Sequence, residues 1–271
     1  MMRSLYTAAS GMKTQQMNVD TISNNLANVN TTGFKKERLE FKSLLYETLA
    51  KAGTDQQGNG KPVNLQVGHG VKPVGTVRSY TIGTIQKTDN PLDLAITGDG
   101  FFTVKDQSGS QVYTKDGSFK IALVDDRQML ITSDGYQVLD INDEPIYFDS
   151  NIDIKKISIS SEGNFSYVTN DNEVVPMDSK MKMVQFRNVN GLEALGNNLL
   201  RATSSSGEAI LEEDDEDVVK SQIVQGSLEG SNVQVVEEMV NLIVAQRAYE
   251  VSSKAIQASD EMLSQANNLK R

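Results

Sequence analysis

Apolar residues recur every seven positions near the start of the chain. The first column contains Leu5, Met12, Val19 and Leu26, and a companion set three residues later contains Ala8, Ile22 and Val29. A seven-residue repeat keeps one stripe of a helix facing a partner helix, as the a and d positions of a coiled coil do. The pattern therefore predicts a long N-terminal helix that packs against another helix.

The remaining faces of this predicted helix carry almost no charge. Arg3, Lys13 and Asp20 are the only charged residues among positions 1–33, and Ser, Thr, Gln and Asn fill most other polar positions. Asn and Thr each cost about half a kcal/mol relative to Ala in a helix, so solvated surfaces usually carry Glu, Lys or Arg instead. Uncharged polar groups can be enclosed when each finds a hydrogen-bond partner. We therefore expect these faces to contact protein; a weak, frayed surface helix is the alternative.

The segment SNNLANVNTTGFKK, residues 23–36, indicates how this helix ends. With Gly33 as a left-handed C′ residue, Phe34 becomes C″ and Val29 becomes C3, the pair whose apolar contact accompanies a Schellman cap. Lys35 and Lys36 are then expected beside the carbonyl end of the helix dipole.

A second column with the same period lies at the other end of the chain. It contains Val235, Leu242, Tyr249, Ile256 and Leu263, flanked by the small residues Ala245, Ser252, Ser259 and Ala266. Ser231 and Gln234 fit an S-x-x-Q capping box just before it. We expect one helix over residues 232–268, which pairs with the N-terminal helix.

The residues between the two predicted helices change pattern. Residues 50–70 are rich in Gly, Gln and Asn and are typical of an extended linker or long hairpin. Short alternating apolar runs, such as residues 101–104 and 138–141, predict strands. The turns between strands are indicated by Asp99-Gly100, Asp116-Gly117, Asp134-Gly135 and Glu162-Gly163, where glycine is expected to supply the positive φ of a tight hairpin.

These patterns predict an α+β fold. Long N- and C-terminal helices are expected to form a coiled-coil domain from residues 1–45 and 222–271. An extended linker or hairpin is expected at residues 46–75, and an all-β domain at residues 76–221.

Composition narrows the classes of partner. The net charge of −10 and the pI of about 4.7 argue against nucleic acid or anionic lipid as the main partner, because their phosphates would be repelled. The chain has no long apolar run and no basic segment before one, so neither membrane insertion nor a cleaved signal peptide is expected. The acidic tract at residues 212–217 is expected to be a solvated charge run rather than a cation site.

Candidate catalytic groups are few. The chain has no cysteine, and its one histidine, His69, lies between two glycines, a poor scaffold for a catalytic triad. It contains no GKS or GKT phosphate loop and no GxGxxG that opens a helix. A zinc site would need mostly carboxylates, and the acid-glycine pairs fit turns better than a glycosidase site. We expect no enzymatic activity, no cofactor and no metal site.

Three segments resemble one protein family. They are SLYTAASGMKTQQMNVDTISNNLANVNTTGFKK near the N-terminus, NPLDLAITGDGFFTV at residues 90–104, and EGSNVQVVEEMVNLIVAQRAYEVSSKAIQASDEML near the C-terminus. Together they resemble the flagellar basal-body rod family of bacterial axial proteins, which covers rod, hook and hook-associated subunits. The length and the polar stretch between Leu45 and Val67 are most similar to the distal-rod members. The acidic tract departs from the family pattern in a variable loop.

The resemblance implies a structural subunit. Such subunits are exported unfolded through the flagellar type III apparatus without a cleaved signal, and they stack helically into a hollow drive shaft across the periplasm. The implied partners are further copies of the chain in a helical homopolymer, neighbouring rod and hook subunits, the export machinery and the ring proteins around the rod. The linker at residues 46–75 is expected to brace adjacent subunits.

Periodicity and resemblance together predict an assembly interface on both ends of the chain. Its residues are Leu5, Met12, Val19, Ile22, Asn24, Asn25, Leu26, Asn28, Val29, Gly33, Phe34, Val235, Met239, Leu242, Tyr249, Ile256 and Leu263. Three alternatives remain: a proximal rod or hook subunit of the same family, a peptidoglycan- or carbohydrate-binding β protein with coiled-coil ends, and a monomeric coiled-coil adaptor.

Overall fold

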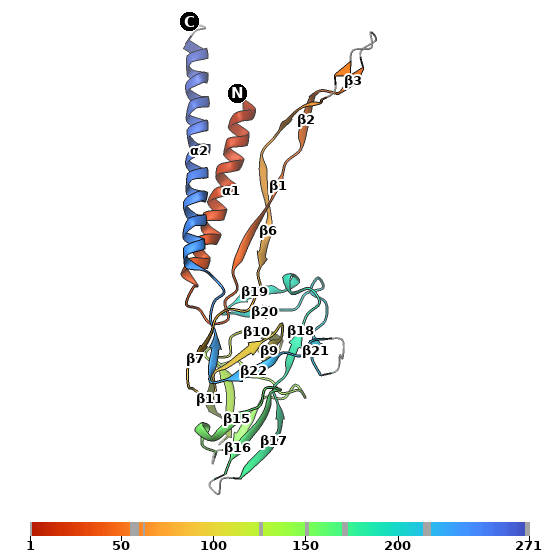
Figure 1. The fold of residues 1–271 in the computed structure, drawn as a ribbon, viewed down its shortest axis with the longest axis vertical. Helices are drawn as coiled ribbons and strands as arrows, with labels where there is room; N and C mark the ends of the chain where they lie inside the picture. Colours follow the sequence, from red (N-terminus) through yellow and green to blue (C-terminus); the bar gives the residue numbers. More distant parts are fainter. Residues whose placement is uncertain are drawn as a thin grey trace. The chain divides into compact units, whose positions relative to one another are not determined.

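The computed structural model describes residues 2–54, 60–61, 63–124, 127–149, 152–169, 173–213 and 218–268. The chain divides into two compact units, which are considered separately. The helix–ribbon unit comprises Met1–Ala27, Glu37–Arg78 and Gln234–Arg271, and the β unit comprises Asn28–Lys36 and Ser79–Val233. The predicted α+β class is confirmed, with one helix at each end of the chain and strands between them (Figure 1).

The helix–ribbon unit contains two helices and a long antiparallel ribbon. Its helices are α1 (Met2–Ala27) and α2 (Val235–Asn268). The ribbon pairs β1 (Glu37–Ser43) with β6 (Val71–Arg78), β2 (Tyr46–Ala50) with β5 (Leu65–Gly68), and β3 (Gly53–Thr54) with β4 (Gly60–Lys61). The predicted linker is therefore mostly paired strand where it is described; residues 55–59 and 62 lie outside the described part. The base of the ribbon borders α1, where Ser10 Oγ accepts the Val71 N–H at 3.4 Å.

The β unit is built from antiparallel strands. Its main sheet runs β11 (Phe119–Val124), β12 (Arg127–Thr132), β13 (Gln137–Val138), β9 (Phe101–Lys105), β10 (Gln111–Thr114), β20 (Leu199–Arg201) and β19 (Glu193–Gly196). Branching from this order are β14 (Tyr147–Asp149) on β12, β18 (Met183–Gln185) on β9 and β21 (Ile210–Leu211) on β18. A second sheet orders β15 (Ile157–Ile159), β16 (Asn164–Val168) and β17 (Val174–Lys180). Two pairs join β22 (Gln222–Gln225) to β8 (Leu94–Thr97) and β23 (Ser227–Glu229) to β7 (Ile85–Lys87).

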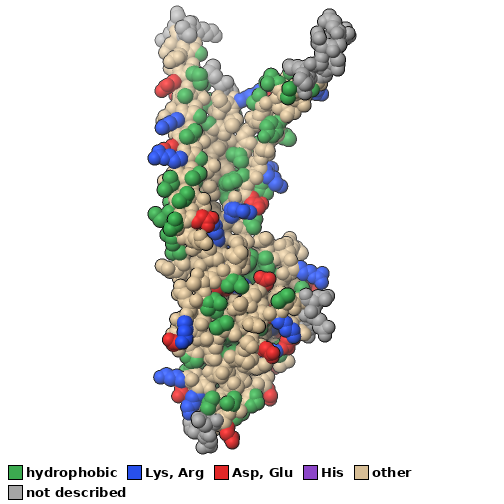
Figure 2. All heavy atoms as spheres, viewed as in Figure 1, with side chains coloured by type: hydrophobic (Ala, Val, Ile, Leu, Met, Phe, Trp, Pro, Cys, Tyr) green, Lys and Arg blue, Asp and Glu red, His purple; other side chains and the backbone are tan. Residues whose placement is uncertain are grey.

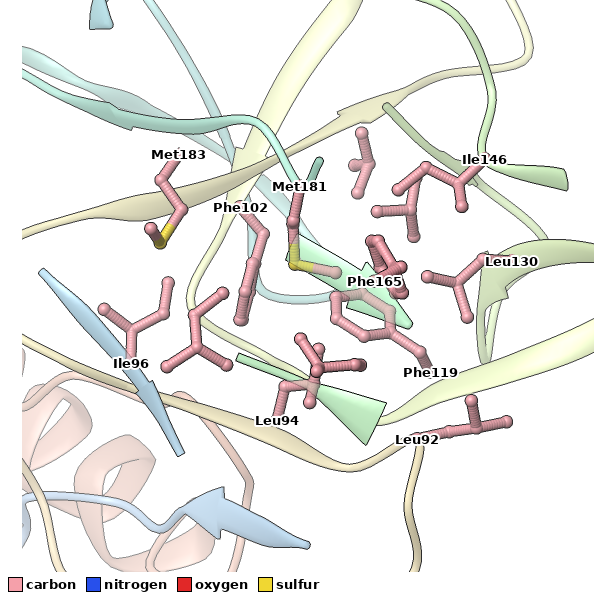
Figure 3. Packing of buried hydrophobic residues seen from close by; sticks show 14 of the residues in the cluster. Leu92, Leu94, Ile96, Phe102, Phe119, Leu130, Ile146, Phe165, Met181 and Met183 are labelled. Atoms are coloured by element: carbon pink, nitrogen blue, oxygen red, sulfur yellow. The ribbon is translucent and has the colours of Figure 1, made fainter. Parts of the chain in front are cut away.

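Alternating apolar residues of these strands form the core of the β unit. Phe102, Phe119 and Phe165 are at most 1% exposed, and aliphatic side chains from several strands surround them (Figure 3). The rings of Phe102 and Phe119 meet edge to face with centroids 5.1 Å apart. A smaller cluster forms around Phe101 and Tyr113. Burial of this apolar surface is the main stabilising contribution to the unit.

The predicted role of glycine holds at two of the four acid-glycine turns. Gly135 and Gly163 have φ of +86° and +87°, in the β12–β13 and β15–β16 hairpins. The prediction is wrong for Gly100 and Gly117, which lack a positive φ. A Cβ on Gly117 would lie 1.7 Å from the carbonyl oxygen of Leu94, so close backbone approach requires glycine there.

The predicted Schellman cap is wrong, because α1 already ends at Ala27. Gly33 does have a left-handed φ of +67°, but its N–H donates to the carbonyl of Glu229 at 2.8 Å. A Cβ on Gly33 would lie 2.8 Å from the backbone nitrogen of Asp116. Gly33 thus allows residues 28–36 to lie against the backbone of the β unit. Lys35, predicted beside a helix end, is instead buried in that unit.

The C-terminal helix begins at Val235, slightly later than predicted. Asn232 is engaged within the β unit, where its Oδ1 accepts the Lys36 N–H at 2.7 Å. Ser231 Oγ accepts the N–H of Val233 at 3.3 Å. The predicted capping box is therefore wrong, because Ser231 accepts the N–H of Val233, which precedes the first residue of the helix.

Candidate assembly interface

The line of closest contact between α1 and α2 is built of small residues. The hydroxyls of Ser4 and Ser259 are 3.3 Å apart, and a Cβ on Gly11 would lie 3.3 Å from Ser252 Oγ. Ala245 occupies the same line of α2 and is 2% exposed. Small side chains let two helix backbones approach closely. The helices are antiparallel, because Ser4 lies beside Ser259 whereas Gly11, later in α1, lies beside Ser252, earlier in α2. Whether they supercoil as a coiled coil stays a prediction.

Asn25 joins three elements of the helix–ribbon unit. Its amide nitrogen donates to the Glu37 carbonyl at 2.8 Å and to Glu238 Oε2 at 3.0 Å, and its Oδ1 accepts the Glu37 N–H at 2.9 Å. The side chain therefore pairs with β1 as a neighbouring strand would. Glu238 lies in the first turn of α2, where the helix dipole stabilises a carboxylate. The burial of Asn25, which belongs to the segment at residues 23–36, is therefore explained by hydrogen bonds within its own chain.

The predicted interface residues differ in exposure. Ile22, Asn25 and Gly33 are buried within the chain. The half-buried members are Leu5, Met12, Val19, Leu26, Asn28, Val29, Phe34, Leu242, Ile256 and Leu263. The exposed members are Asn24, Val235, Met239 and Tyr249. Contact of these residues with a neighbouring subunit stays a prediction.

α2 also exposes an apolar face that the seven-residue period did not single out. Val236, Val240, Ile243, Val244 and Val251 are each between 54% and 76% exposed. Figure 2 shows hydrophobic side chains gathered along this helix. Their spacing of i, i+4, i+7, i+8 and i+15 places them on one face, opposite the line that packs on α1. We call this set the α2 stripe; the nearly unbroken apolar run at residues 239–244 was the available signal.

A groove runs along one flank of the helix pair. Gln16 and Val19 of α1 and Gln246, Tyr249 and Glu250 of α2 line a volume of about 390 Å³. Val19 and Tyr249 come from the two predicted columns. Residues of the two predicted columns therefore lie at this flank of the helix pair, while small residues occupy the line where α1 and α2 are closest.

In the β unit, a buried ion pair joins the segment after α1 to the strand before α2. Lys35 Nζ lies 2.6 Å from Glu229 Oε1, with side chains 4% and 0% exposed. Lys35 also donates to the Thr81 carbonyl at 2.9 Å, and Glu229 Oε1 accepts the Gly83 N–H at 2.8 Å. Within the described residues, Glu229 Oε2 is buried without a hydrogen bond. We call these four residues the Lys35–Glu229 cluster.

Lys115 brings a further buried cation into the β unit. Its Nζ donates to the Gly98 carbonyl at 2.7 Å and lies 5.0 Å from the centroid of the Phe101 ring. Burial lowers the pKa of Lys115 to about 8, and the charge of Glu229 partly offsets this shift. The titration of Lys115 therefore makes the stability of the β unit depend on pH.

The acidic tract is only partly described, since residues 214–217 lie outside the described part. Glu212 is buried, and its carboxylate accepts the Ser221 N–H at 2.9 Å and a Gln185 amide hydrogen at 2.7 Å. The prediction of a solvated charge run is thus wrong for Glu212, because these donors replace its hydration.

His69 is exposed on the ribbon. Its Nε2 lies 3.8 Å from the Glu47 carboxylate, which also pairs with Arg3 at 2.5 Å.

Among the described residues, no group of three or more His, Asp or Glu side chains could hold a metal ion. None of the described helices is long and apolar enough to cross a membrane.

Three stretches of the chain match known protein families. Residues 5–35 match the family described as "Flagella basal body rod protein". Residues 95–167 match "Flagellar hook protein FlgE/F/G D1 domain", and residues 224–269 match "Flagellar basal body rod FlgEFG protein C-terminal".

Full-length relatives carry corresponding names. The chain is 48% identical to the flagellar basal-body rod protein FlgG of Borreliella burgdorferi, with all of both chains covered. It is 39% identical to the protein of the same name from Bacillus subtilis, again over all of both chains. It is 32% identical to the flagellar hook-basal body complex protein FlhP of Bacillus subtilis, with the same coverage.

Proposed function

The chain belongs to the flagellar basal-body rod protein family, and from that premise we propose that it is a distal-rod subunit that polymerises helically into a hollow drive shaft and transmits torque. The α2 stripe is the observation that carries this proposal. Contiguous apolar surface that the chain itself leaves exposed marks an interaction site with another protein. The family is one of structural rod proteins, so no catalytic step is assigned.

The terminal helices supply the contacts of the shaft in this proposal. The close α1–α2 approach at Gly11 and Ala245 makes each subunit contribute one stiff helix pair. The two seven-residue columns and the α2 stripe then bury apolar surface against neighbouring pairs, which contributes about 25 cal/mol per Å². Uncharged faces of α1 pack in the same tube because enclosing amides costs less than enclosing unpaired charges.

The further partners follow from the proposed place of the subunit. They are neighbouring rod and hook subunits, the type III export machinery and the ring proteins around the rod. In this proposal the export machinery delivers the subunit to the rod that spans the periplasm. The ribbon at residues 46–75 braces adjacent subunits, since its exposed Leu49 and Leu65 lie on a two-stranded element that is marginal alone.

Electron microscopy of concentrated full-length protein tests the proposal. We expect straight hollow tubes, and a chain that stays monomeric at high concentration contradicts it. Peptidoglycan co-sedimentation is the companion measurement. Strong binding through residues 76–221 by a chain that never polymerises favours the carbohydrate-binding alternative.

A second comparison separates a distal-rod subunit from a hook subunit. Replacing residues 46–66 by a short loop is expected to give curved polymers, because the bracing ribbon is lost. Straight tubes from this variant contradict the bracing role.

A further inference from the structure

The helix–ribbon unit presents two different surfaces that the chain leaves open. One is the α2 stripe, whose five side chains are at least 54% exposed. The other is the groove lined by Gln16, Val19, Gln246, Tyr249 and Glu250. The stripe lies opposite α1, whereas the groove lies where α1 and α2 meet, so one helix pair cannot fill its own groove with its own stripe.

We propose that the α2 stripe of one copy docks into the Val19–Tyr249 groove of the next copy. This inference rests on the proposed function and specifies which surfaces meet. A contact between two different surfaces is heterologous, so each added copy leaves one stripe and one groove available. A stripe-to-stripe contact is instead self-complementary and closes as a dimer. A heterologous contact whose rotation does not close into a ring continues into an open filament.

The chemistry of the two surfaces is compatible. The stripe carries no charge, and most of the lining surface of the groove is apolar, with Val19 and Tyr249 as its two apolar residues. The one carboxylate in the lining, Glu250, is already paired with Arg247 of its own helix at 3.0 Å. Docking an uncharged stripe therefore leaves no carboxylate without a partner.

The available area indicates how strong the contact is. The exposed parts of the five stripe residues amount to roughly 500 Å², whereas a stable interface buries about 800 Å² on each partner. A single stripe-to-groove contact is therefore weak, and it persists where further contacts along a polymer add to it. Assembly should accordingly show a critical concentration.

Site-specific cross-linking tests the docking, because the chain contains no cysteine. One variant carries Val244→Cys in the stripe, and a second carries Gln16→Cys on the groove rim. The full-length variants are assembled separately and as an equal mixture, and a short bifunctional maleimide is added. Ser108→Cys, at an exposed hairpin of the β unit, replaces either partner as the control.

We expect a cross-linked pair from the Val244→Cys and Gln16→Cys mixture and none from either variant alone. A strong product from Val244→Cys alone shows stripe-to-stripe packing and overturns the proposal. Tubes that form without a mixed product also overturn it, while leaving the rod function intact. A mixed product without tubes keeps the docking and contradicts the rod function.

A charge substitution provides a second measurement. Val244→Asp is expected to raise the critical concentration for assembly at least tenfold, since the carboxylate would enter a groove whose lining is mostly apolar. The matched control is Val174→Asp, at a residue 65% exposed in the β unit. Equal critical concentrations for the two variants contradict the docking.

Discussion

The buried Lys35–Glu229 ion pair allows a sharp test of how the β unit is held together. In Glu229→Gln the acceptor for the Gly83 N–H is retained, but the Lys35 ammonium loses its counter-charge in a site where it is 4% exposed. Removing one partner of a buried pair typically costs about 3–5 kcal/mol, because the remaining charge is left uncompensated. We expect a loss of unfolding free energy in that range from Glu229→Gln and a similar loss from Lys35→Met.

The double variant distinguishes a specific ion pair from general disruption. Lys35→Met combined with Glu229→Gln removes both charges, so more than half of the loss should be recovered. The matched control is Lys87→Met, which breaks a pair of 2.9 Å whose side chains are 78% and 77% exposed. We expect this control to leave the unfolding midpoint unchanged.

Urea unfolding followed by near-UV circular dichroism provides the assay. The chain has no tryptophan, and Tyr113 packs edge to face on Phe186 with centroids 4.8 Å apart, so the signal reports the β unit. Circular dichroism at 222 nm reports the helices separately. Losses below about 1 kcal/mol for both single variants, or additive losses in the double variant, would refute the reasoning.

Three further outcomes are expected. Asn25→Ala should lower the opening free energy of α1 by about 3 kcal/mol, because three hydrogen bonds are lost; hydrogen exchange of α1 should then be about 100-fold faster than in the control Ser23→Ala, and equal rates contradict this. Gly33→Val should destabilise the β unit by more than about 2 kcal/mol in urea unfolding, since the left-handed φ and the approach to the Asp116 backbone both exclude a branched side chain; an unchanged midpoint contradicts this. With Lys115 titrating near pH 8 in the folded state and near 10.5 in the unfolded state, unfolding free energy should rise by about 3 kcal/mol as pH increases from 8 to 10.5, since only the folded state loses its proton there; Lys115→Met should remove this rise.

The helical ends could be predicted because their signal is local. The columns beginning at Leu5 and Val235 follow a fixed period, and they predicted both helices. The helix ends were missed for a physical reason. Gly33 and Ser231 suggested local caps. The Gly33 N–H instead donates to Glu229 of β23, and Asn232, next to Ser231, accepts the Lys36 N–H, so both contacts join segments that are far apart in sequence.

The candidate interface was predicted in part. Val19 and Tyr249, from the two predicted columns, line the groove. The closest line between the helices is instead formed by the small residues near Ala245, because backbone approach was favoured over interdigitation of large side chains. The α2 stripe was missed, since a seven-residue period selects one face and α2 is apolar on two.

The sequence by itself determined that a helix forms at each end of the chain with strands between them, and that the N-terminal helix carries few charges. Periodicity and residue type encode those features within a few turns of chain. Only the tertiary structure decided which polar groups are enclosed. Lys35 finds Glu229, and Asn25 finds Glu37 and Glu238, because folding brings distant segments together, and a buried charge or amide is stable only beside the partner it meets there.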